Sequence, residues 1–137
     1  MYLKRKIDAF LLSWKNDSQK MPLIIKGARQ IGKTATIRRF SRLYENFVEI
    51  NFALEPQYKT ICSGGYSVQN IIKNISLLDP SKKITAHKTL ILFDELQDYP
   101  EIATSLKFFN QDRRFDVICS GSLLGINYKK IESNSRK

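Results

Sequence analysis

The stretch GARQIGKT, at residues 27–34, is the part of the sequence that decides the expected fold. Its two glycines stand five positions apart and Lys33 and Thr34 follow, which fits the P-loop pattern G-x-x-x-x-G-K-S/T. The apolar run 22–25 before it is short enough for a buried strand, and 35–44 carries apolar residues at helical spacing. The pattern requires a strand before it and a helix after it, so the context supports the assignment.

The residue types of this stretch suit a polyphosphate ligand. Glycine lets the backbone curl tightly, so that the N–H groups of the loop point inward and cradle phosphates with the positive end of the next helix. Lys33 would reach the β- and γ-phosphates, and the Thr34 hydroxyl would ligate Mg²⁺. The alternative, a glycine-rich turn with an unrelated lysine, is disfavoured by the flanking strand and helix. The predicted nucleotide-binding residues are Gly27, Ala28, Arg29, Gln30, Ile31, Gly32, Lys33, Thr34 and Ala35.

A second candidate element follows the continuously apolar run 89–93, which is typical of a central parallel strand. Asp94 and Glu95 come directly after this run. An Asp at the carboxyl end of a strand can hold Mg²⁺ beside the Thr34 hydroxyl, and ligands of open α/β sheets collect at that edge. Glu95 would act as a general base on the water that attacks the γ-phosphorus. The alternative for this acidic pair is a helix cap.

Two serines follow the next expected strand, 115–119. Either Ser120 or Ser122 would hydrogen-bond the γ-phosphate or the attacking water as a polar sensor, and the alternative is a turn that uses small residues. Arg29, inside the loop, either touches a phosphate or folds back on an acidic residue, and the sequence does not choose. The predicted catalytic residues are therefore Glu95, Lys33, Ser120 and Ser122, and the predicted metal ligands are Thr34 and Asp94.

Strand-like and helix-like segments alternate along the whole chain. This order predicts an α/β fold with a parallel sheet, helices on both faces and right-handed crossovers. Strands are expected at 22–25, 47–52, 89–93 and 115–119, and helices at 2–14, 35–44, 57–62, 68–78 and 100–110, with Ser67 as a helix cap and Trp14 in the core. We expect one nucleotide-binding domain over 1–128, with an N-terminal helix and loop at 1–20, and a disordered basic tail over 129–137.

At this point the chain resembles a known family. The motifs GARQIGKT, ILFDELQ at 91–97 and ICSGSLLG at 118–125, with NFALEP at 51–56, look like the N-terminal AAA-like domain of a large bacterial and archaeal ATPase family. Members of that family typically continue into a C-terminal domain of uncharacterised function. The resemblance assigns Walker A to residues 27–34, Walker B to Asp94 and Glu95, and the sensor position to Ser120 or Ser122.

The resemblance also implies a three-layer P-loop NTPase fold with a defined sheet. The sensor strand lies between the Walker A and Walker B strands, so that the order is second, third, fourth, first, or 2-3-4-1. A fifth strand would flank the first, and no segment is left for it, so we expect the chain to be a truncated fragment. An uncovered first strand would be a sheet edge, and exposed edges invite pairing, which predicts self-association.

Composition and charge restrict the remaining choices. The net charge of +10 is uneven: residues 1–46 carry 11 Lys and Arg against 3 Asp and Glu. This basic first third would suit nucleic acid or an acidic partner, although no recognition motif accompanies it. The alternative is that these charges form a solvated face. No apolar run is long enough for a bilayer, which excludes a membrane span, and two cysteines among apolar or small residues fit free thiols in a reducing cytoplasm.

The leading functional prediction is an ATP-binding domain of an Mg²⁺-dependent ATPase. The full-length parent would hydrolyse ATP to ADP and phosphate, with weak or no turnover in this chain, because activating groups usually come from elsewhere. The rival interpretation is a nucleotide-dependent switch or scaffold that turns over only incidentally. A third is a nucleic-acid-associated motor or regulator, suggested by the basic first third. The preference for adenine comes from the resemblance alone.

Overall fold

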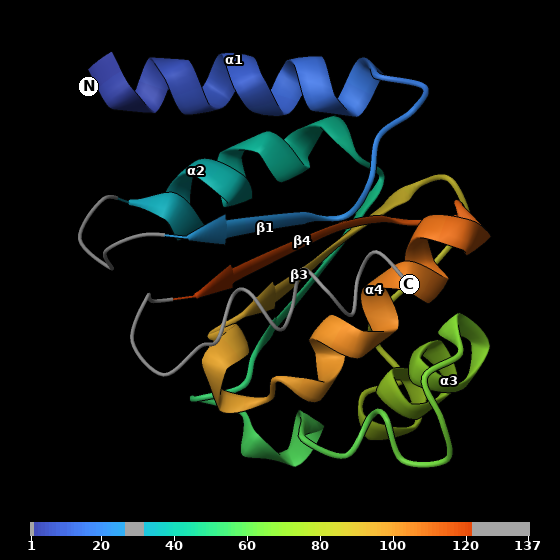
Figure 1. Ribbon diagram of the computed structural model, residues 1–137. Coiled ribbons are helices and arrows are strands. Elements are labelled where there is room, and N and C mark those ends of the chain that lie inside the picture. The colour runs from blue at the N-terminus through green and yellow to red at the C-terminus, as the bar shows by residue number, and fades with distance from the viewer. Residues whose placement is uncertain (1, 27–31, 122–137) are drawn as a thin grey trace.

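The computed structural model describes residues 2–26 and 32–121 of the chain, with side chains described from Lys6 onward. Four parallel strands form one sheet in the order β1-β4-β3-β2 (Figure 1). This confirms the predicted fold class and strand order. The strands of this sheet are β1 (Leu23–Lys26), β2 (Asn46–Asn51), β3 (Thr89–Asp94) and β4 (Asp116–Gly121).

Helices cover both faces of the sheet, as the alternating pattern predicts. One face carries α1 and α2, and the other carries α3 and α4 (Figure 1). The four α-helices of the described residues are α1 (Tyr2–Asn16), α2 (Lys33–Phe40), α3 (Val68–Leu78) and α4 (Glu101–Asp112). Single 3₁₀ turns connect them to strands at η2 (Ser41–Leu43), η3 (Pro56–Tyr58) and η4 (Leu96–Asp98).

Several element boundaries differ from the predicted ones. The helix after the P-loop starts two residues earlier than expected, at Lys33, and ends at Phe40, where the chain tightens into a 3₁₀ turn. The helical piece expected at 57–62 is only the turn Pro56–Tyr58. The cap at Ser67 is confirmed, because its Oγ accepts a hydrogen bond from the Asn70 N–H at 3.1 Å.

The first of two cores lies between the sheet and the α1–α2 layer. It is formed by buried side chains from both helices and from the central strands, at Leu11, Trp14, Ile37, Phe40, Leu90, Leu92 and Ile118. Trp14, predicted as a core residue, is buried there, and its indole N–H donates to the Met21 carbonyl at 2.8 Å. The N-terminal helix is thereby fixed both to α2 and to the chain that enters β1.

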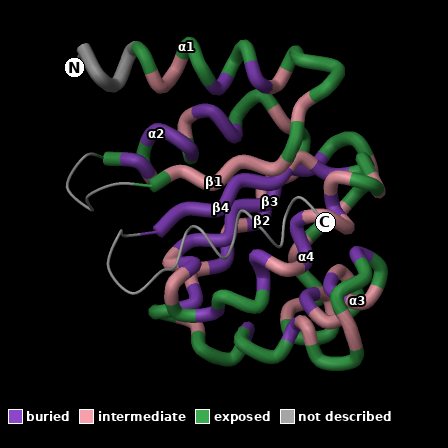
Figure 2. Tube along the Cα trace, viewed as in Figure 1, coloured by how far each residue is buried: buried purple, intermediate pink, exposed green. Residues whose placement is uncertain are grey.

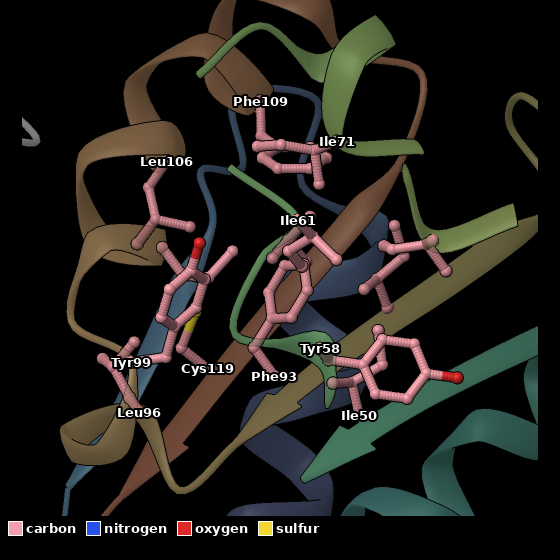
Figure 3. Packing of buried hydrophobic residues seen from close by; sticks show 14 of the residues in the cluster. Ile50, Tyr58, Ile61, Ile71, Phe93, Leu96, Tyr99, Leu106, Phe109 and Cys119 are labelled. Carbon is pink, nitrogen blue, oxygen red and sulfur yellow. The ribbon is translucent and has the colours of Figure 1, made fainter. Parts of the chain in front are cut away.

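The larger core lies on the opposite face, under α3 and α4 (Figure 3). Phe93 is at its centre, with ring centroids 5.9 Å from Phe52 and 6.2 Å from Phe109. Side chains from the turns after β2 and β3 close the cluster, among them Tyr58 and Tyr99. The turn that follows β3 is therefore anchored in the core by its own residues.

The alternation of side chains along the central strands sets the direction of the residues that end them. Leu90 and Leu92 face α2, so Asp94, two positions on, faces α2 as well. The same alternation takes β4 from Ile118 to Ser120. Two polar side chains are thus brought to the carboxyl edge of the sheet on the side where α2 begins.

One of the two edge strands of the sheet is β1, which pairs only with β4 among the described strands. Figure 2 shows the difference in burial: β4 is buried from Val117 to Gly121, whereas β1 is half-buried and ends in the exposed Lys26. The edge position of β1 is as predicted, and self-association through it stays a prediction. The segment expected as a basic tail, 129–137, lies outside the described residues.

Candidate functional site

The end of the P-loop is described from Gly32 onward. Gly32 has φ 67° and ψ 28°, a left-handed conformation that suits glycine, and its carbonyl accepts the Thr36 N–H at 3.0 Å. The helix α2 therefore begins directly after Gly32, with Lys33 and Thr34 in its first turn. The predicted binding residues Gly27, Ala28, Arg29, Gln30 and Ile31 lie outside the described residues, and Ala35 is exposed on the first turn of α2.

Lys33 is buried, with 7% of its surface exposed. Its ammonium Nζ donates a hydrogen bond to the carbonyl of Gly121, the last residue of β4, at 3.0 Å. Burial lowers the pKa of Lys33, and the carboxylates of Asp94 and Glu95 act in the opposite direction. Lys33 is therefore a desolvated ammonium group that is hydrogen-bonded to the end of β4 and influenced by the two carboxylates at the end of β3.

Asp94 connects three elements at the carboxyl edge of the sheet. The Thr34 hydroxyl, from α2, donates to Asp94 Oδ2 at 3.3 Å. The Ser120 hydroxyl, from β4, donates to Asp94 Oδ1 at 2.7 Å, and the Glu95 N–H donates to the same oxygen at 2.8 Å. The structure therefore brings together Thr34, Asp94 and Ser120, which the sequence places at far separated positions.

The donor set at this point suits a magnesium ion. Mg²⁺ prefers oxygen ligands and is usually bound by one or two carboxylates together with substrate phosphates and waters. The hydroxyl of Thr34 and the carboxylate oxygen Oδ2 of Asp94 are two such ligands, already within hydrogen-bond distance. Among residues 2–26 and 32–121, no three His, Cys, Asp or Glu side chains gather into a metal site.

Glu95 has an unusual backbone. Its φ of 58° and ψ of 51° are left-handed, which is rare for a residue with a side chain. The turn η4 follows at once, and the Asp98 N–H donates to the Glu95 carbonyl at 2.9 Å. The amide Nε2 of Gln97 donates to Glu95 Oε1. Backbone conformations of this kind are concentrated at functional sites.

Two groups of this site were missed by reasoning from the sequence. The Gly121 carbonyl is a main-chain group, which any residue type would supply, so no sequence signal could reveal it. Gln97 lies two positions after Glu95 in an irregular turn, outside any helical or strand periodicity. The remaining predicted residue, Ser122, lies outside the described part of the chain, whereas Ser120 is described and buried.

The fold and the arrangement at this edge define a P-loop nucleotide-binding domain of the ATPase type. A comparison with protein families agrees: a family model described as "AAA domain" matches residues 19–137. The chain belongs to this AAA domain family. No helix among the described residues has the length and apolar character needed to cross a bilayer.

Solved structures give the same fold. The structure of C. elegans PCH-2 is similar to this chain, with an alignment that covers 98% of this chain, a TM-score of 0.54 and 17% sequence identity. The match covers 41% of the PCH-2 chain, so this chain spans about two fifths of its length. At this identity the similarity concerns the fold alone. No curated protein matches the sequence.

Proposed function

We propose that this chain is the ATP-binding domain of an Mg²⁺-dependent ATPase, whose full-length parent hydrolyses ATP to ADP and phosphate in the cytoplasm. One observation carries the proposal. The Thr34 hydroxyl at the start of α2 lies 3.3 Å from Asp94 Oδ2 at the end of β3, 60 positions later in the chain. In P-loop ATPases the residues at these two positions hold the metal ion.

The loop and the first turn of α2 would bind the phosphates. The N–H groups of residues 27–32, together with those of Lys33, Thr34 and Ala35, would cradle the phosphates at a helix N-terminus. Lys33 would exchange its hydrogen bond with the Gly121 carbonyl for one with a phosphate oxygen, which offers a full negative charge in place of a dipole. Thr34 and Asp94 would hold Mg²⁺, which neutralises phosphate charge when bound.

Glu95 and a polar sensor residue would carry out hydrolysis. The Glu95 carboxylate would take a proton from a water whose oxygen forms a bond to the γ-phosphorus, while the bond from that phosphorus to ADP breaks. Ser120, whose hydroxyl donates to Asp94, would act as the sensor by hydrogen-bonding the γ-phosphate or the attacking water. Ser122 is the second candidate for this role. Turnover by this chain alone should be slow, because activation of such sites usually needs a group from another domain or subunit.

A switch or scaffold is the second candidate function, and one contact favours it. The hydrogen bond from Lys33 Nζ to Gly121 joins the phosphate-binding lysine to the last residue of β4. If a phosphate replaced the Gly121 carbonyl as the partner of Lys33, β4 would lose this contact at its last residue. Such a domain would reshape a partner surface on binding ATP, with or without turnover. The burst and steady-state rates of phosphate release, measured with and without candidate partners, separate the two functions.

If this domain also binds nucleic acid, its basic first third would be the binding surface. Part of that charge is already neutralised, since Arg38 pairs with Glu49 at 2.6 Å and Arg39 with Asp8 at 2.8 Å. Binding through phosphate contacts would weaken steeply with added salt, so a titration of binding against salt concentration tests it. Self-association through β1 is tested by light scattering, where a monodisperse monomer at high concentration contradicts it.

The binding site is tested by Lys33→Ala. Loss of a charged hydrogen-bond donor costs about 1.5–3 kcal/mol, so we expect ATP affinity to fall by about 10- to 100-fold in calorimetry. Lys73→Ala, which removes an exposed lysine on α3, is the matched control and should bind as the wild type does. An ATP affinity that is the same in both variants would refute the site.

The base is tested by Glu95→Gln, which keeps the shape of the side chain but cannot accept a proton. Turnover should fall by about 100-fold or more while ATP binding persists, because general-base catalysis contributes at least this much. Phosphate release under single-turnover conditions is the measurement. Unchanged turnover would exclude Glu95 as the base and leave the binding site intact.

A further inference from the structure

Gln97 has no role in the function proposed so far, yet it contacts the residue proposed as the base. Its side-chain amide donates to Oε1 of Glu95, only two positions earlier. Both side chains are half-buried. A hydrogen bond between an amide and a carboxylate has a charged acceptor, which makes it stronger than one between two neutral groups. The contact therefore restricts the orientation of the Glu95 carboxylate.

The position of Gln97 is fixed by its neighbours in the turn η4. Leu96 is fully buried and Tyr99 is 7% exposed, and both side chains enter the larger core (Figure 3). The Tyr99 hydroxyl accepts the Cys62 N–H at 3.0 Å, which joins the turn to the segment after η3. Since both flanks are held in this way, Gln97 is presented to Glu95 by a rigid support.

Glu95 is held toward the phosphate-binding lysine in the same arrangement. The negative charge of Glu95 acts on the buried ammonium of Lys33, and the Glu95 backbone is left-handed. The Glu95 carbonyl is also engaged, by the Asp98 N–H at 2.9 Å. The backbone and the side chain of Glu95 are thus both fixed by the turn that follows it.

We propose that Gln97 is a positioning residue that holds the Glu95 carboxylate in the orientation needed to accept the proton of the attacking water. This inference rests on the function proposed above. The amide only donates a hydrogen bond and takes no part in the proton transfer, in which the water proton passes to Glu95, the water oxygen bonds to the γ-phosphorus and ADP leaves. Proton transfer requires the base within hydrogen-bond reach, so a loose carboxylate should lower the rate of the chemical step.

The test removes the donor and keeps the length of the side chain. Gln97→Met should lower kcat by about 10- to 100-fold while KM and the affinity for ATP stay unchanged, because misplaced catalytic groups affect the chemical step. Gln97→Glu should be slower still, since two carboxylates in contact repel each other. Gln69→Met, at an exposed position on α3, is the matched control and should retain full turnover. Urea unfolding of each variant identifies any loss of stability.

A second measurement does not depend on turnover. In the proton–nitrogen NMR spectrum, the Nε2 protons of Gln97 should move toward the position of the exposed Gln69 amide when Glu95→Ala removes the acceptor. An unmoved Gln97 signal, or a Gln97→Met variant with wild-type kcat beside an inactive Glu95→Gln, overturns the positioning role and leaves the proposed function intact. Wild-type turnover in Glu95→Gln instead overturns the proposed base.

Discussion

The two ends of the sheet use polar side chains in different ways. At the amino edge, where the strands begin, Asp116 accepts a hydrogen bond from the Tyr44 hydroxyl and lies 3.5 Å from the Lys20 ammonium. Arg113 donates to the carbonyls of Lys20, at 2.5 Å, and Ser18, at 3.1 Å. These contacts join the linker before β1 to the start of β4 and to the end of η2.

A hollow of about 320 Å³ lies at this amino edge and is lined by charged side chains of both signs. Two of its lining lysines have acidic partners: Lys88 lies 3.5 Å from Glu45, and Lys20 lies 3.5 Å from Asp116. At the carboxyl edge, in contrast, a buried lysine faces two adjacent carboxylates and a main-chain carbonyl. Charge at the amino edge therefore contributes to stability, and, under the function proposed above, charge at the carboxyl edge contributes to ligand binding. Substitutions should therefore separate into those that affect folding and those that affect binding.

The largest effect is expected at the carboxyl edge, from Asp94→Asn. This change removes the charge but keeps the shape, so the metal-dependent part of ATP binding should be lost. ATP affinity in the presence of Mg²⁺ should fall by about 10- to 100-fold, and affinity measured with EDTA should stay the same. Equal losses with and without Mg²⁺ would argue against a metal ligand at this position.

Tyr44→Phe examines the amino edge and should give the opposite result. The hydroxyl that binds Asp116 is lost, which leaves a half-buried carboxylate with one donor fewer and lowers the free energy of unfolding by about 1–3 kcal/mol. ATP affinity should not change. Tyr66→Phe, at an exposed position before α3, is the matched control. If Tyr44→Phe weakened ATP binding and left stability intact, the division between the two edges would be wrong.

The smallest effect concerns an ion pair near the amino edge and depends on pH. The hydrogen bonds from Arg114 lower the pKa of Asp112 below its ordinary value. A carboxylate with a lowered pKa in the folded state stabilises it above the unfolded-state pKa of about 4, and this contribution is lost as the pH falls through the folded-state value. Asp112→Asn should thus cost about 0.2–1 kcal/mol at pH 7 and less at about pH 2. Urea unfolding at both pH values checks this; an equal cost at both would show that the charge is not its source.

Reasoning from the sequence predicts the parts of this molecule that depend on residue type and period. The apolar run before Asp94 identifies the central strand, and the pattern of glycines with Lys33 and Thr34 identifies the loop and the helix. The strand order 2-3-4-1 came from the resemblance to a family, since four parallel strands can be ordered in several ways. The approach of Thr34, Asp94 and Ser120 then follows from that order, because the carboxyl ends of neighbouring parallel strands share one edge.

What the sequence does not reveal depends on geometry without a compositional signal. The contact of Lys33 with Gly121 uses a carbonyl that every residue has, and Gln97 reaches Glu95 only because η4 tightens the chain. The left-handed conformation of Glu95 is equally hidden, since Glu is not a residue type that favours it. Such details decide how a site functions, and they come from tertiary packing around the turn.

The packing of Trp14 gives this protein an internal optical probe. It is the only tryptophan of the sequence, it is 7% exposed, and its indole is held between Phe40 and the Met21 carbonyl. Its emission should shift to longer wavelength when α1 detaches from the domain, and it should be insensitive to ligands at the far edge of the sheet. Tryptophan fluorescence of the unlabelled chain therefore follows the docking of the N-terminal helix against α2.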